Sequence, residues 1–250
     1  MMITHFIFMS SSYSLGKRIA LDFIVEDEKI QSKLKEYLDR ITEECGRDVS
    51  ISTHMIQAED TTWKSVCKSD HFFKGVEVID SLDKFIKLIK KDRELEGIDI
   101  AKYILSKIKC TQLKLQKLVY LCFADYLCDT GKKLFTDSIY AFKYGPVVDT
   151  VYKRYKKYGY KPITEEKNDI NSTVPEMPAK SRILFAADGT EKMISIETTL
   201  KKYGQLTASQ LVELTHKEST PWTMTPKSTW ISYSEIKPEM IKMYHKFEEI

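Results

Sequence analysis

Two spacings of apolar positions alternate along the first part of the chain. Apolar side chains recur at every second position in residues 3–9 and 19–25, which predicts two strands. The Ser- and Gly-containing stretch 10–16 between them is typical of a turn. Residues 30–41 then carry one apolar stripe at helical spacing, and Gly46 provides a stop for that helix. The pattern therefore predicts two strands followed by a helix in the opening segment.

The next stretch repeats this mixture. Residues 49–55 and 76–79 predict two more strands, and Asp80 or Ser81 is placed to cap a following helix. Residues 59–70 have no clear period. A charged run ending at Gly97 marks the predicted domain boundary. We therefore expect residues 1–97 to form an α+β unit with about four strands and two helices.

From residue 98 onward the spacing is helical. We expect 134–142 to be a strand or loop, 161–190 to be a loop-rich insertion, and Thr220-Pro221-Trp222 to break the chain. Gly145-Pro146 is predicted to open a helix, and Ser234 to cap the last one. The predicted fold class is α+β, with the N-terminal unit followed by a mostly helical domain over 98–250. Its helices are predicted at 100–108, 115–130, 145–158, 194–203, 207–216 and 235–247.

Composition narrows the class of protein only slightly. The 250 residues include 39 Lys and Arg against 36 Asp and Glu, and a net charge of +3 does not select a partner. Five cysteines occur without a C-x-x-C pair, so the sequence predicts neither a disulfide framework nor a zinc site. No signal peptide or membrane-spanning stretch is recognisable, and we expect a cytoplasmic protein.

Several ordered blocks in the second half point to one family. Residues 113–120 read LKLQKLVY, 141–148 read AFKYGPVV, and 203–222 contain spaced YG, TH and PW pairs. Together they resemble the Panacea (SocA-like, DUF4065) antitoxin domain, although Phe142 stands where that family usually has Trp and Thr220 lengthens the spacing from His to Pro-Trp. The positions that carry the resemblance are Leu115, Leu118, Tyr120, Gly145, Pro146, His216, Pro221 and Trp222.

The resemblance implies a mostly helical domain without known catalytic chemistry or cofactor. It also implies an antitoxin of a bacterial or phage toxin–antitoxin system, with a protein toxin from a neighbouring gene as partner. Residues 1–97 lie outside the resemblance, and toxin contact, dimerisation and operator binding all remain open for them. An alternative is a phage- or plasmid-encoded protein that inhibits another host factor.

Two clusters are candidates for contact with a partner. Tyr140, Phe142 and Tyr144, with Lys143 among them, form an aromatic patch suited to binding, or they fill the core. Lys153 and Lys156 lie beside tyrosines, a pattern that suits a phosphate backbone but is more typical of a solvated helix face with the tyrosines turned inward. The sequence therefore neither supports nor excludes nucleic-acid binding.

The sequence gives weaker support for catalysis or metal binding. His216 has no second histidine at metal-binding spacing, so we expect it to cap the helix carbonyls or to pack on Trp222. The Ser-rich segment 11–17 lacks the first glycine of a phosphate loop, and its lysine is followed by Arg18 instead of Ser or Thr. A metal-dependent hydrolase or nuclease would need carboxylates such as Glu59, Asp60 and Asp70 to converge.

Overall fold

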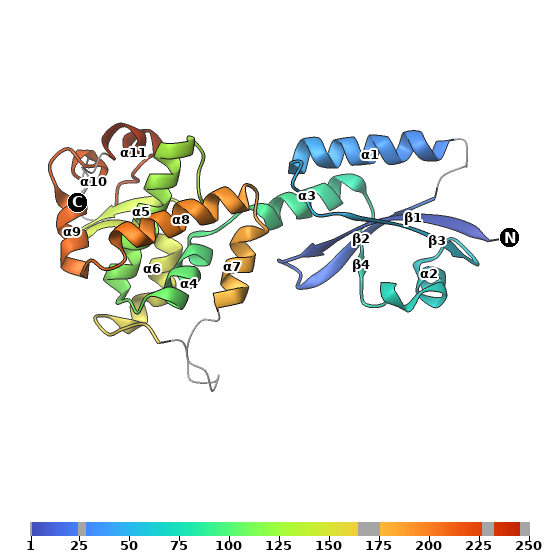
Figure 1. Cartoon of the computed structure of the whole chain (residues 1–250), viewed down its shortest axis with the longest axis horizontal. Helices are drawn as coiled ribbons and strands as arrows, with labels where there is room; N and C mark the ends of the chain where they lie inside the picture. Colours follow the sequence, from blue (N-terminus) through green and yellow to red (C-terminus); the bar gives the residue numbers. More distant parts are fainter. Residues whose placement is uncertain (1, 25–28, 165–175, 227–232, 246–250) are drawn as a thin grey trace. The chain divides into compact units, whose positions relative to one another are not determined.

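The computed structural model describes residues 2–24, 29–164, 176–226 and 233–245. The chain divides into two compact units, residues 1–94 and 95–250 (Figure 1). The first contains a four-stranded sheet with helices, and the second is mostly helical with one β-hairpin. The predicted α+β class is confirmed.

The first unit is built on a twisted sheet of four strands. They are β1 (Ile3–Ser12), β2 (Lys17–Phe23), β3 (Ser52–Ala58) and β4 (Glu77–Val78). Their order is β3-β1-β2-β4, so β1 is central and antiparallel to both β2 and β3, whereas the short β4 is parallel to β2. Strands β3 and β4 therefore form the two edges.

Helices cover both faces of this sheet. Because successive side chains of a strand point to opposite faces, Phe8 of β1 packs against α1 (Ile30–Cys45) and α3 (Leu82–Arg93), while Ile7 faces the other way. That second face is covered by α2 (Trp63–Ser69) and the 3₁₀ turn η2 (His71–Phe73). Ser81 caps α3 by accepting a hydrogen bond from the backbone of Lys84.

Two features of this unit differ from the prediction. The third strand lies at 52–58 instead of 49–55, because its pairing with β1 runs from Ser52 to Ala58. The stretch at 59–70, which has no clear apolar period, contains α2, and the unit accordingly has three α-helices among the described residues. Helix α2 is short and is fixed by its cap, since the Thr62 side chain accepts from the Ser65 N–H.

The second unit is organised around one helix, α5 (Gln112–Thr130). Residues on all sides of α5 are buried, from Leu115 and Leu118 to Tyr126. It starts at the Thr111 cap and ends at Gly131, whose left-handed conformation stops the helix. Helices α4 (Gly97–Lys107), α8 (Gly189–Tyr203), α9 (Ala208–His216) and α11 (Pro238–Tyr244) contact it, as does the hairpin of β5 (Ile139–Phe142) and β6 (Gly145–Val148).

The prediction that Gly145-Pro146 opens a helix is wrong. These residues begin strand β6, and the helix α6 (Asp149–Tyr155) starts after Val148. The 3₁₀ turn η3 (Lys156–Tyr158) follows α6 directly. Gly145 has a φ of 100°, which a helix excludes, and Pro146 can occupy a hairpin edge because its missing N–H is not needed there.

Three further boundaries also differ. The expected insertion at 161–190 contains α7 (Glu176–Leu184), which buries Ala179 and Ile183; residues 165–175 of it lie outside the described residues. Pro221 starts the short helix α10 (Pro221–Met224) after an extended Thr220 that caps it, so the expected break is a single residue. Ser234 does not cap α11, because its carbonyl accepts from Ala141 and the chain first pairs with β5.

Of the helices in the described ranges, none is both apolar enough and long enough for a membrane span.

Candidate partner-binding surface

The hairpin β5–β6 presents a tight turn at the surface of the helical unit. Four residue pairs align its strands, and the last pair, Phe142 with Gly145, leaves only Lys143 and Tyr144 in the turn. Both are exposed, and the Tyr144 side chain keeps 55% of its accessible surface. The Lys143 ammonium lies 5.4 Å from the Tyr144 ring centre. The turn therefore offers an aromatic ring and a positive charge together.

Side chains from distant parts of the chain hold the backbone of this hairpin. The Gln116 side-chain amide accepts from the Val148 N–H at 2.9 Å and donates to the Val148 carbonyl at 3.4 Å. The Lys117 ammonium donates to the Pro146 carbonyl at 2.9 Å, and the Trp222 indole N–H donates to the Phe142 carbonyl at 2.8 Å. Sequence reasoning missed Gln116 and Lys117. The available signal was the presence of two adjacent polar residues within an apolar helix.

Lys117 is fully buried beneath the hairpin. Desolvation lowers the pKa of its ammonium group to about 7. Gly145 makes this approach feasible, since a Cβ at that position would lie 2.7 Å from the Lys117 nitrogen and 3.0 Å from the Thr215 hydroxyl. A glycine with positive φ is thus required both by the turn and by the lysine below it.

The remaining positions of the resemblance also lie in this framework. The side chains of Leu115, Leu118 and Tyr120 are buried on α5. The His216 ring stacks on the Trp222 indole with ring centres 3.7 Å apart and planes 2° apart, one of the two arrangements expected for it. Pro221 starts the helix that carries this tryptophan. Of these positions, Trp222 holds the hairpin directly, through its hydrogen bond to the Phe142 carbonyl.

The aromatic residues of the hairpin lie outside the hydrophobic core. Phe142 stacks on Tyr233 with ring centres 3.7 Å apart and meets Tyr152 edge-on at 5.4 Å. Tyr140, in the same strand, is also only partly buried. We call the turn and these rings the hairpin surface: Tyr140, Phe142, Lys143, Tyr144, Tyr152 and Tyr233.

Positive charge gathers in the segment that begins at the hairpin turn. Lys156 is exposed, and the exposed Lys153 pairs with Asp149 at 2.5 Å. Tyr155 is buried in the core and the Tyr158 hydroxyl donates to the Thr164 carbonyl, so the lysines point outward and the tyrosines inward. Residues 143–161 contain one acid, Asp149, against six basic residues: Lys143, Lys153, Arg154, Lys156, Lys157 and Lys161.

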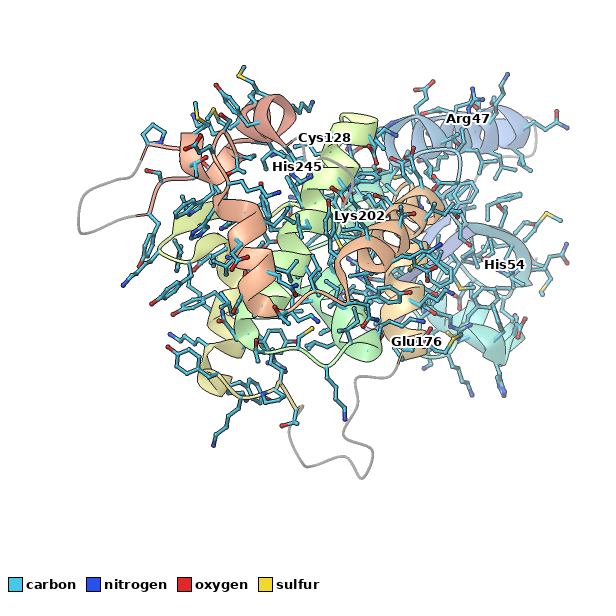
Figure 2. The ribbon with its side chains drawn as sticks, turned by 60° about the vertical axis from the view of Figure 1, so that its left-hand side comes forward. Arg47, His54, Cys128, Glu176, Lys202 and His245 are labelled. Carbon is cyan, nitrogen blue, oxygen red and sulfur yellow. The ribbon has the colours of Figure 1, made fainter. Side chains whose placement is uncertain are left out.

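A second polar region, missed from the sequence, lies between α5, α8 and the end of α11. Asp125 accepts hydrogen bonds from the His245 ring at 2.7 Å and from the Thr199 hydroxyl at 2.7 Å. Cys128 and Lys202 line the same pocket, of about 580 Å³ (Figure 2). Desolvation, then the charges of Asp125 and Asp129, raise the pKa of Cys128, which keeps the thiol protonated. The hydrogen bond between His245 and Asp125 links the end of α11 to α5.

The carboxylates considered for metal chemistry have separate structural roles. Glu59 pairs with Lys68 at 2.8 Å, and Asp60 accepts from the Thr62 backbone and hydroxyl. Asp70 caps η2 by accepting from the Phe72 N–H. Among the described residues, no group of three or more His, Cys, Asp or Glu side chains is arranged to hold a metal ion.

Comparison with known proteins identifies the class to which this framework belongs. The model of the family described as antitoxin SocA-like, Panacea domain, matches residues 115–223, from α5 to α10. This range contains the hairpin and the residues that hold it. The chain belongs to the SocA-like Panacea family, as the sequence blocks predicted.

The similarity to one curated relative covers a longer stretch of the chain. The chain is similar to the antitoxin SocA of Caulobacter vibrioides (strain NA1000 / CB15N), with 30% identity over 142 residues. The alignment covers 54% of this chain and 72% of the relative. No solved structure matches the chain significantly.

Proposed function

We propose that the protein is an antitoxin that neutralises a cognate protein toxin, encoded by a neighbouring gene, by binding it directly. Membership of the SocA-like family and similarity to a protein named antitoxin SocA support this role. We assign the neutralising function to residues 98–250, and an accessory function to residues 1–97. The activity requires no catalysis or cofactor, because blocking a toxin needs only a complementary surface and slow dissociation. The proposed setting is the cytoplasm of a bacterium, with the gene pair carried by the chromosome or a prophage.

The hairpin surface is the proposed binding site. The observation that supports it is the combination of two exposed tyrosine rings, Tyr144 and Tyr233, with a hairpin backbone that three buried side chains hold by hydrogen bonds. Tyrosine binds well at interfaces because it buries a large area while losing few rotamers. A rigid backbone adds affinity because little conformational entropy is lost on docking.

Charge indicates the kind of surface that the toxin presents. Lys143 is exposed in the turn, and Lys156 is exposed on η3 in the same basic segment. An acidic patch on the toxin would complement them and accelerate association. A nucleic-acid contact is less well supported, because Tyr155, which alternates with the lysines, is buried and unable to stack on a base.

Growth rescue tests this proposal. The wild-type chain, co-expressed with the toxin of the adjacent gene, is expected to restore growth, whereas Tyr144→Ala combined with Lys143→Glu is expected to abolish rescue. Both side chains are exposed and outside the core, so the variant should fold normally, which circular dichroism checks.

A matched control is available in the first unit. Tyr13 has 57% of its surface exposed, close to the value for Tyr144, and Tyr13→Ala is expected to leave rescue intact. Loss of rescue in Tyr13→Ala, with retention in the double variant, would move the toxin contact to the first unit and contradict the assignment.

A further inference from the structure

Strand β3 is an open edge of the sheet in the first unit. Among the described residues it pairs only with β1, over all seven residues from Ser52 to Ala58. Its outer side therefore carries a row of backbone N–H and C=O groups available to another strand. The opposite edge, β4, is only two residues long and offers no comparable row.

This edge lacks the usual protection against pairing. Proteins shield long edge strands with charged side chains, proline or bulges. The sequence of β3, STHMIQA, contains no proline and no Asp, Glu, Lys or Arg, in a chain in which 30% of residues are charged. Met55 lies at its centre with 68% of its side chain exposed (His54, its neighbour, is labelled in Figure 2). Such a strand is suited to pair along its length.

We propose that the β3 strands of two copies of this chain pair antiparallel, joining the two sheets into one. Two copies of β3 pair over their greatest length when the two-fold axis passes through Met55, because this register uses every residue from Ser52 to Ala58. Thr53 then lies opposite Gln57 of the second copy. Met55 lies opposite Met55, and no charged residues face each other within the strand.

The faces of the two sheets also remain aligned. A two-fold axis perpendicular to the sheet brings residues of the same face together. Met55 pairs with Phe6 in β1 and shares the face covered by α1 and α3, so both Met55 side chains would meet on that face and lose their exposure to water. Burial of this apolar contact adds to the backbone hydrogen bonds.

Sedimentation velocity of the full chain, up to about 100 µM, tests the proposal because assembly depends on concentration. The wild-type chain is expected to form dimers. Met55→Lys places two like charges opposite each other at the axis and is expected to weaken the dimer by at least about tenfold. Met55→Glu should do the same, and an equimolar mixture of the two variants should restore dimers, since the opposing charges are then complementary.

Met177 supplies the control, since it is 70% exposed and lies on α7 of the other unit. Met177→Lys is expected to leave the dimer unchanged. A wild-type chain that stays monomeric over the whole range would overturn the proposal. So would a Met55→Lys variant that dimerises as strongly as the wild type.

Discussion

The two units bury polar side chains for different purposes. In the first unit, His5 is buried and bonds to the Asp22 carboxylate of the neighbouring strand at 2.9 Å and to the Asp60 carbonyl after β3 at 2.9 Å. In the second unit, Gln116 and Lys117 are buried in the central helix and bond to the backbone of a hairpin about 30 residues further along. The first arrangement links the strands of one sheet, whereas the second holds a hairpin at the surface. The family match covers the second arrangement and not the first.

The largest expected effect comes from disrupting the central helix. Leu118 is fully buried in α5, and Leu118→Asp is expected to unfold the second unit, because an unpaired buried charge costs several kcal/mol, on the order of total stability. Hydrogen-exchange mass spectrometry should show loss of protection over 95–250 with protection retained over β1–β3. Ile194→Asp, at a position that is 63% exposed on α8, should change neither. Joint unfolding of both units would contradict their independence.

The next effect concerns pH. Because burial lowers the pKa of Lys117 from 10.5 to about 7, the unfolded chain binds a proton there that the folded chain lacks, and the second unit gains stability as pH rises above 7. This gain amounts to about 2 to 3 kcal/mol between pH 7 and 9.

Urea denaturation of wild type and Lys117→Met at both pH values measures this gain as a difference. The variant should lack it, because methionine does not titrate. Comparing the two chains cancels the contribution of other groups, such as the buried Cys110, whose pKa is raised to about 11 by desolvation. Equal slopes with pH in both chains would show that Lys117 is not responsible.

An effect of similar size is expected in the first unit. His5→Ala leaves the Asp22 carboxylate, whose pKa desolvation already raises, without its histidine partner. We expect a loss of about 2 to 3 kcal/mol, confined to the first unit. Hydrogen exchange over β1–β3 should quicken while that of α5 stays unchanged. His54→Ala, at a partly exposed position of the same sheet, serves as the control and should have a smaller effect.

The smallest effect separates backbone strain from contact. Gly145→Ala is expected to cost about 2 kcal/mol, because alanine is strained at positive φ and its Cβ would meet the Lys117 nitrogen. Gly131 lies in the left-handed helical region, with φ 75° and ψ −4°, and a Cβ there would make only an ordinary contact of 3.8 Å with the Lys242 nitrogen, so Gly131→Ala should cost only about 1 kcal/mol. Equal losses of thermal stability in the two variants would show that the contact beneath Gly145 contributes nothing.

The sequence predicted most of the architecture but not the links between distant segments. Alternation and helical spacing sufficed for β1, β2, α1, α3 and α5, since each buries one clear face or is buried throughout. Periodicity could not reveal α2, which depends on a threonine cap, or β6, where a glycine-proline pair adopts a strand because the hairpin and Lys117 require it. Family blocks marked Gly145 and Trp222, but only the structure shows that both act on the same hairpin.

We propose that the hairpin surface of the helical unit docks onto a protein toxin. Titration calorimetry of the purified full chain with the toxin of the adjacent gene tests it most directly. We predict tight binding by the wild type and an affinity at least about 30-fold weaker for the Lys143→Glu, Tyr144→Ala double variant, as expected when an aromatic anchor is lost. An unchanged affinity in a folded double variant would contradict the claim.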